Sequence, residues 1–281
     1  MNPLCCIFNY NENENANSLY VEFSKHVETF VLDSDSLNPY PYFINVSNLY
    51  CTNLFNHAIR MFKNGEYSHL CIITSDVVMN PESILYVCNK MKHWSNSIGV
   101  YQLQADKHSK DWHNPWTNIP FQQVAKYKFY ETPMVEGFFN IIHGDIVNLM
   151  EEIPLDVNKF GVCITKYYCE ISKLLKKKII IDTKYTIFHP DKKGYDYNES
   201  HSYDQKFFVW MNEQLKQVNN TGKFRILDAH FNWLVDKSHS RLQILDKVSQ
   251  HFNKDNIICA EIGVFRGDFS KKIQEYLNPK H

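Results

Sequence analysis

Short apolar runs alternate with amphipathic helical patterns along roughly the first two hundred residues of the chain. The runs that predict strands are Leu4–Phe8, Glu28–Leu32, His69–Thr74, Ser97–Leu103 and Lys178–Asp182. The patterns that predict helices are Ala16–His26, Leu49–Lys63, Pro81–His93 and Thr165–Lys176. Because strands that alternate with helices build parallel βαβ units, the pattern predicts an α/β domain with a largely parallel sheet flanked by helices.

A second unit is predicted after the polar stretch Asn212–Lys223, whose Asn, Thr and Gly residues are typical of loops. The domains predicted from this change of pattern are residues 1–215, a linker over 216–240, and a short unit over 241–281. That unit contains about one βα repeat, with elements predicted at Arg241–Phe252, Ile257–Ile262 and Asp268–Leu277. A single βα repeat cannot close a sheet, so we expect an incomplete domain.

Composition and charge narrow the class of partner. Apolar residues make up 44% of the 281 residues, enough for a large buried core, and 30 basic side chains face 31 acidic ones. A net charge near zero gives no general attraction to nucleic acid or to an anionic membrane surface. We therefore expect small molecules or neutral polymers as partners.

The eight cysteines show neither CxxC spacing nor pairing with histidine, so they are interpreted as buried thiols in a reducing compartment. The N-terminus lacks a basic segment ahead of an apolar one, and no run of about 18 apolar residues occurs. These features predict a cytoplasmic protein without a transmembrane segment.

Two acidic residues follow predicted strands directly. Asp33 ends the second strand, where ligands of doubly wound sheets bind, so it is a candidate nucleotide contact; the alternative is a simple turn. Asp76 ends the third strand, where a carboxylate can hold a divalent cation that neutralises a diphosphate. Asp76 could instead cap the next helix, but Asn80, directly before Pro81, is better placed to do so.

Two further residues are candidates on weaker grounds. His189 lies beyond the last predicted strand and could bind a metal ion or a phosphate, or be an ordinary surface histidine. Glu136, in the segment Val135–Phe139, could remove a proton from an acceptor hydroxyl, or be an exposed acid between core phenylalanines.

Aromatic residues cluster in a proline-containing segment and are candidates for a platform on which a sugar stacks, with core filling as the alternative. They are Trp112, Trp116, Phe121 and Tyr130.

In their order along the chain, these features resemble the GT-A glycosyltransferases, in particular family 2-like enzymes that build viral or bacterial surface glycans. The resemblance covers roughly residues 1 to 215 and rests on LDSDS, ITSDVVMNPESI, VEGFF and IFHP. It implies a GT-A, Rossmann-like fold with a mostly parallel mixed sheet. It also implies that Asp33, Ser75, Asp76 and His189 bind the nucleotide sugar, that Asp76 and His189 bind Mn²⁺ or Mg²⁺, and that Glu136 lies near the acceptor.

The chain departs from the family pattern in two places. The DxD-type metal motif is reduced to Thr74, Ser75 and Asp76, which leaves one carboxylate. Where many relatives carry an acid in a WGID-like pattern, this chain has Phe160–Thr165, so Glu136 becomes the candidate for the catalytic base.

The C-terminal segment resembles the first motif of class I S-adenosylmethionine methyltransferases, through Glu261, Gly263 and Gly267. The later strands of such an enzyme are absent, so S-adenosylmethionine would serve only a longer parent protein. The alternative is an ordinary βα unit.

Together these features and the resemblance predict a metal-assisted transfer of a UDP-, GDP- or dTDP-linked sugar to a hydroxyl of a glycan acceptor. The resemblance implies that the transfer proceeds with inversion. Two alternatives stay open: a methyltransferase fragment with a glycan-binding N-terminal domain, and a glycan-binding module without catalytic activity.

Overall fold

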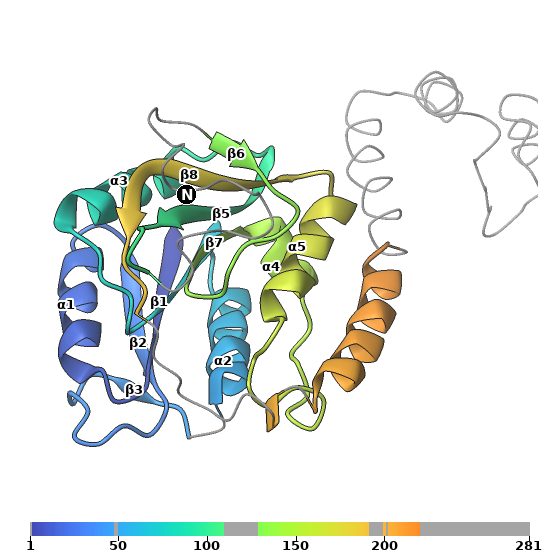
Figure 1. The fold of residues 1–281 in the computed structure, drawn as a ribbon, viewed down its shortest axis with the longest axis horizontal. Helices are drawn as coiled ribbons and strands as arrows, with labels where there is room; N and C mark the ends of the chain where they lie inside the picture. The colour runs from blue at the N-terminus through green and yellow to red at the C-terminus, as the bar shows by residue number, and fades with distance from the viewer. Residues whose placement is uncertain (1, 48–49, 110–128, 191–198, 201, 220–281) are drawn as a thin grey trace, which may run out of the picture. The chain divides into compact units, whose positions relative to one another are not determined.

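The computed structural model describes residues 2–47, 50–109, 129–190, 199–200 and 202–219 of the chain. Contacts divide the chain into two units with the boundary between Asn219 and Asn220, so all described residues belong to the first unit (Figure 1).

The first unit is built on one mixed eight-stranded sheet with the order β3-β2-β1-β4-β7-β5-β8-β6. The strands are β1 (Pro3–Asn9), β2 (Glu28–Asp33), β3 (Ile44–Asn45), β4 (His69–Thr74), β5 (Ile98–Ala105), β6 (Phe129–Glu131), β7 (Phe139–His143) and β8 (Lys178–Ile187). Strands β3, β2, β1 and β4 pair in parallel, as do β5 and β8. Strand β7 is antiparallel to both β4 and β5, and β6 is antiparallel to β8.

Helices cover both faces of this sheet (Figure 1). They are α1 (Asn13–Phe23), α2 (Tyr50–Asn64), α3 (Pro81–Lys92), α4 (Gly144–Leu149) and α5 (Ile164–Leu174), and a further helix runs over 204–219. Helices α1 and α3 pack on one face, where they share a core with β1, β4 and β5. Helices α2, α4 and α5 and the helix over 204–219 contribute to the core on the other face. The predicted α/β class is confirmed.

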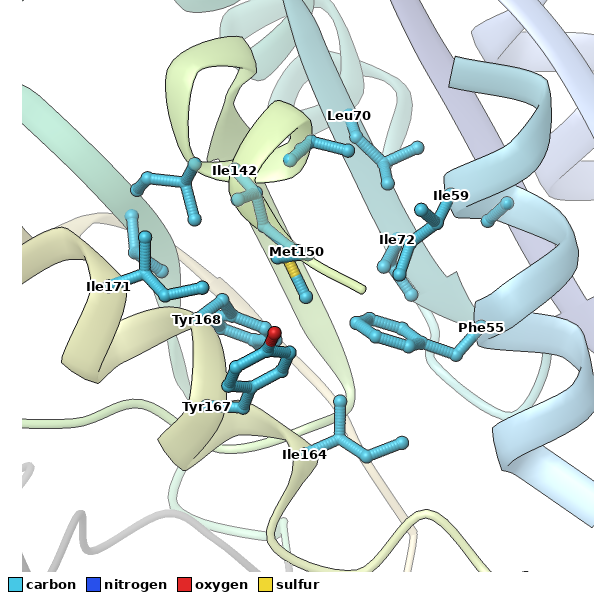
Figure 2. Close-up of a cluster of buried hydrophobic side chains, with 14 of the residues drawn as sticks. Phe55, Ile59, Leu70, Ile72, Ile142, Met150, Ile164, Tyr167, Tyr168 and Ile171 are labelled. Atoms are coloured by element: carbon cyan, nitrogen blue, oxygen red, sulfur yellow. The ribbon is translucent and has the colours of Figure 1, made fainter. Parts of the chain in front are cut away.

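The core under α2 and α5 is closely packed with aromatic and branched side chains (Figure 2). The rings of Phe55 on α2 and Tyr168 on α5 stack with centroids 6.3 Å apart. Ile72 of β4 and Ile142 of β7 belong to the same buried cluster. Burial of these side chains holds α2 and α5 at fixed places over the sheet, which matters because both helices begin beside the candidate site.

The predicted elements agree with the structure to within a few residues, apart from β8. Asn80 caps α3 as predicted, because its side-chain oxygen accepts a hydrogen bond from the backbone amide of Ser83 at 2.8 Å. The strand predicted to end at Asp182 continues to Ile187, since after a register shift Thr186 pairs with Gln104.

The helix over 204–219 runs past residue 215, the predicted end of the first domain. The reason is packing, because Val218 is buried in the core and Leu215 is partly buried against it. The elements predicted over 241–281, and most of the predicted linker, lie outside the described residues, so the two-domain organisation stays a prediction.

All seven cysteines within the described residues are free thiols, and five of them are buried. Burial raises the pKa of the Cys6 thiol above its ordinary range and that of Cys88 to about 12. Such thiols are unreactive core residues, as the sequence predicts.

His69, at the start of β4, makes the fold sensitive to acid. Burial, together with the nearby His143 and Lys177, lowers its pKa to about 3, against an ordinary value of about 6.5. Because the folded pKa lies below the unfolded one, the unfolded chain binds the proton more tightly between these values. Stability is therefore lost as the pH falls from about 6.5 towards 3.

We expect His69→Phe to flatten this pH dependence by up to about 1.4 kcal/mol per pH unit, because one proton is no longer taken up on unfolding. Urea titrations at several pH values between 4 and 7 measure it. The exposed His93, replaced by Gln, is the control; equal slopes in the wild type and His69→Phe would contradict the expectation.

Candidate functional site

The carboxyl ends of β1 and β2 are tied together by a buried polar network. Asp33 is fully buried and accepts hydrogen bonds from Asn9 Nδ2 at 2.6 Å and from the backbone amide of Ser36 at 2.9 Å. The hydroxyl of Ser36 in turn accepts from the amide of Asn11 at 2.7 Å. Asp33 therefore fixes the two loops that follow β1 and β2, and its carboxylate lies within the protein rather than on its surface.

Tyr10 was not among the residues predicted from the sequence. It directly follows β1 and is 48% exposed at the edge of the network that Asp33 holds. An exposed ring at the carboxyl end of a parallel strand can stack on a nucleotide base. The signal available in the sequence was its position, the first residue after the first strand.

The turn after β4 holds Asp76 in a defined place. The amide of Ser75, a buried residue, donates to the carbonyl of Phe8 at 2.9 Å, and that of Val77 donates to Thr74 at 3.1 Å. Asn15, in the first turn of α1, donates its side-chain amide to the carbonyls of Ser75 and Val77. The turn is thus bonded on both sides of Asp76.

His189 reaches Asp76 through a short backbone bridge. Val78 and Phe188 exchange two backbone hydrogen bonds of 2.8 and 3.1 Å, which bring the end of β8 beside the turn after β4. His189 Nε2 then lies 3.4 Å from Asp76 Oδ2. The imidazole also stacks on the ring of Phe138, with centroids 4.9 Å apart and planes 20° apart. Two residues that the sequence placed in separate motifs therefore form one pair.

The Asp76 carboxylate is ionised in this setting. Burial alone would raise its pKa, but hydrogen bonds from His189 and Thr74 outweigh that effect and hold the pKa below its usual value. Its other oxygen, Oδ1, is buried without a hydrogen-bond partner among the described residues. An ionised, buried oxygen without a donor suits a cation, and Asp76 with His189 supplies the oxygen and nitrogen ligands that Mn²⁺ accepts. Within the described part of the chain no third histidine, cysteine or acid completes a metal group.

Two amide side chains clamp the backbone of Glu136. Its carbonyl accepts from Gln102 Nε2 at 2.8 Å and from Asn140 Nδ2 at 2.7 Å, and both amides are buried on adjacent strands. Gln102 also donates to the carbonyl of Phe139 at 3.3 Å. The peptide of Glu136 is thereby fixed over the sheet, which restricts where its half-buried side chain can reach.

The charges of Asp76 and Glu136 act on side chains of α2 and α5. Burial raises the pKa of Cys51, near the start of α2, to about 11, and the Asp76 charge adds to the rise. Burial also raises the pKa of Tyr168 on α5, with smaller contributions from Cys169, Cys51 and Glu136. The Asp76 charge thus acts on a thiol near the start of α2, and the Glu136 charge on a hydroxyl in the second turn of α5.

Gly161 lets the loop before α5 lie against α2. Its φ is +79°, and a Cβ at this position would stand 2.9 Å from the Cβ of Cys51. We expect Gly161→Ala to destabilise the fold by about 1–3 kcal/mol, from both the backbone conformation and the clash. Urea unfolding measures the change.

Gly137→Ala is the matched control, because among the described residues a Cβ there meets only Thr165 Cγ2, at 3.6 Å. Equal stabilities of the two variants would contradict the expectation.

Some predicted site residues lie outside the described residues. They are Glu261, Gly263 and Gly267 of the methyltransferase-like motif and Trp112, Trp116 and Phe121 of the predicted aromatic platform. Tyr130, the remaining platform residue, lies on edge strand β6, where it is partly buried against the core. Among the helices that the structure describes, none has both the length and the apolar content that crossing a membrane requires.

No protein-family model matches the sequence, and no curated protein matches it. Solved structures match in fold. Glucosyl-3-phosphoglycerate synthase from Mycobacterium tuberculosis, in complex with Mn²⁺, UDP-glucose and phosphoglyceric acid, has a TM-score of 0.50 and 10% identity over 76% of this chain and 80% of that chain. TarS 1–349 from S. aureus, in complex with UDP-GlcNAc, has a TM-score of 0.49 and 10% identity over 89% and 80%.

A197 from STIV has a TM-score of 0.39 and 12% identity over 68% of this chain and 87% of that chain. The fold of the first unit is thus the GT-A, Rossmann-like α/β fold of nucleotide-sugar glycosyltransferases, as the sequence predicts.

Proposed function

We propose that this chain is a glycosyltransferase that moves a sugar from a UDP-, GDP- or dTDP-linked donor to an acceptor hydroxyl, with inversion. The observation that carries the proposal is the Asp76–His189 pair, 3.4 Å apart, with one carboxylate oxygen buried and without a donor. The pair lies at the carboxyl ends of the sheet strands, where ligands of open α/β folds bind. The GT-A fold supports the same class of donor.

The donor is proposed to lie across the ends of β1, β2 and β4. The loop after β1 carries the exposed ring of Tyr10, which stacks on the base. Asp33 acts as the positioning carboxylate that holds this loop and the loop after β2. The turn after β4, which contains Ser75, then places the donor diphosphate beside Asp76 and His189. Asp33, Ser75 and His189 are each held in place by hydrogen bonds to neighbouring segments.

Asp76 and His189 would hold Mn²⁺ or Mg²⁺, and such an ion supplies Lewis-acid stabilisation of a developing diphosphate charge. The protein's own part is to keep the Asp76 carboxylate ionised and largely buried, and to orient the imidazole between Asp76 and the Phe138 ring. The stacked ring restricts rotation of the imidazole, so its nitrogen stays directed at the carboxylate.

Glu136 is proposed to accept the proton of the attacking acceptor hydroxyl. Its peptide is clamped by Gln102 and Asn140, so the carboxylate works from a fixed base, and effective proton transfer needs such positioning. The hydroxyl would attack the anomeric carbon on the side opposite the leaving diphosphate, which gives inversion. The acceptor is proposed to be a glycan, and the free thiols support a reducing compartment, the cytoplasm.

The test is a hydrolysis and transfer assay. Purified full-length protein with Mn²⁺ is incubated with UDP-, GDP- and dTDP-sugars, with and without mono- and oligosaccharide acceptors, and the released nucleotide is measured. We expect slow hydrolysis of at least one donor and faster release with a suitable acceptor. If calorimetry showed glycan binding but no nucleotide binding, the chain would be a glycan-binding module and the proposal would fail.

A further inference from the structure

The peptide group that joins Phe188 to His189 is hydrogen-bonded on both of its sides. Its carbonyl, that of Phe188, accepts from the backbone amide of Val78 at 2.8 Å. Its N–H, that of His189, donates to the hydroxyl oxygen of Ser109 at 2.9 Å. Because a peptide group is planar, two bonds on opposite sides fix its orientation, whereas the carbonyl bond alone would let the plane pivot. The Ser109 bond therefore restricts the direction in which the His189 side chain leaves the backbone.

Ser109 is itself held in place by the turn that follows β5. Its side chain is buried, and its hydroxyl lies 3.0 Å from Asp106 Oδ1 and 3.2 Å from the carbonyl of Ile187, either of which can accept its single proton. The same Asp106 oxygen accepts from the amide of His108 at 2.8 Å, and the amide of Asp106 donates to Ile187 at 2.8 Å. The turn thus presents the Ser109 oxygen to the His189 N–H from a fixed place.

Loss of the Ser109 hydroxyl would leave the rest of the β8 end hydrogen-bonded. The carbonyl of Ile187 keeps its bond from the turn after β5, and Phe188 keeps both bonds of its bridge to Val78. These remaining bonds are made by main-chain atoms alone. The effect of the lost hydroxyl is therefore concentrated on His189.

The orientation of the His189 imidazole decides what the pair with Asp76 can bind. Its Nε2 lies 3.4 Å from Asp76 Oδ2. Stacking on Phe138 limits tilting of the imidazole, but a stacked ring can still slide along the plane of its partner. The Ser109 bond acts on the backbone and so opposes this sliding. Such restriction matters, because a displacement of about 1 Å can cost a site about 100-fold in rate.

We propose that Ser109 is a positioning residue for the Asp76–His189 pair. Its buried hydroxyl, supported by Asp106, fixes the main chain of His189 so that the imidazole stays directed at the Asp76 carboxylate. Ser109 acts through His189 and not on the substrate. That the pair holds Mn²⁺ or Mg²⁺ beside a diphosphate rests on the proposed function; the positioning itself rests on the hydrogen bonds of Ser109.

The experiment compares the full-length wild type with Ser109→Ala and Ser172→Ala. Ser172 is the matched control, because it too is buried and its hydroxyl donates to the carbonyl of Lys177 at 3.0 Å, directly before β8 begins. The two serines thus hold opposite ends of the same strand, and Ser172 holds the end that does not lead to His189. Thermal melts establish that each variant is folded.

The first arm needs neither metal nor donor. Nuclear magnetic resonance of ¹⁵N-histidine-labelled protein, at a single pH, records the ring nitrogens of His189, which are identified by their loss in His189→Gln. The change that Asp76→Asn causes in the Nε2 shift then measures the contact between imidazole and carboxylate. We expect this change to be at least about twofold smaller when Ser109→Ala is also present, because the two side chains are no longer held together. In Ser172→Ala it keeps its wild-type size.

The second arm measures Mn²⁺ affinity by electron paramagnetic resonance in the presence of UDP, GDP or dTDP. Ser109→Ala is expected to weaken Mn²⁺ binding about tenfold or more, the usual effect of removing a group that orients a metal ligand. Ser172→Ala should bind Mn²⁺ as the wild type does.

The inference is overturned if Ser109→Ala keeps the full response of the His189 shift to Asp76→Asn, or binds Mn²⁺ as tightly as the wild type. Should the wild type bind no Mn²⁺ with any of the nucleotides, the proposed function fails, and the first arm alone decides the role of Ser109. Should Ser109→Ala not fold, hydrogen exchange of the wild type decides instead. Slow exchange of the His189 amide supports the inference, and exchange as fast as in an unstructured peptide overturns it.

Discussion

Asp76→Asn is expected to lower the rate of donor hydrolysis, and Mn²⁺-dependent nucleotide affinity, on the order of a hundredfold or more. Asparagine keeps the volume of aspartate and one of its oxygens but removes the negative charge. In this structure that charge lies on a carboxylate whose Oδ1 is buried without a donor among the described residues and whose Oδ2 lies beside the His189 imidazole. Because the Asp76 pKa lies below its usual value, the wild-type carboxylate remains charged across the neutral range. Asp76 therefore sets no pH limit on activity there.

The measurements are nucleotide release from the donor and calorimetry with the nucleoside diphosphate and Mn²⁺. Asp145→Asn is the control, because Asp145 is an exposed acid in the first turn of α4, where it pairs with Lys177. Wild-type rates and metal dependence in Asp76→Asn would remove the basis of the proposed donor site.

Glu136→Gln is expected to slow transfer to the acceptor by about 10²–10⁴-fold, the usual contribution of a general base. Glutamine has nearly the same shape, and the Gln102 and Asn140 clamp acts on the backbone of residue 136, so the fold and the donor site are preserved. Nucleotide affinity should therefore stay unchanged while the transfer rate falls, which separates a base from a donor contact.

Steady-state transfer rates as a function of pH test this expectation, because removal of the base also removes the acid limb that it creates. Glu131→Gln, on the exposed edge strand β6, is the control. A variant that keeps the full transfer rate would show that another group takes the proton.

Strands β1 and β4, in the first half of the fold, could be predicted because each one appears in the sequence as a continuous run of apolar residues. Strand β1 is buried along its whole length and β4 nearly so, and both appear as uninterrupted apolar runs in the sequence. Strand β7 was missed: it is five residues long, and it contains Asn140 and His143. Its insertion between β4 and β5 is a long-range pairing that no local pattern encodes.

The structure brings together two residues that the sequence analysis named separately as site candidates, Asp76 and His189, through contacts that the sequence does not reveal. Asp76 and His189 were named separately, but their contact depends on the bridge between Val78 and Phe188. This bridge is made by backbone hydrogen bonds, so the types of the residues do not reveal it. Asp33 was expected to meet the ligand directly, and its position at the end of β2 gave no sign that Asn9 and Ser36 would enclose it.

The bridge between Val78 and Phe188 uses main-chain atoms alone. Substitution at these two positions by any residue other than proline leaves it intact. Inserting one residue between the adjacent Phe188 and His189, or deleting His189, would turn a different side chain towards Asp76. The number of residues between the bridge and the imidazole, rather than the side chains of the bridge itself, therefore decides which residue faces Asp76.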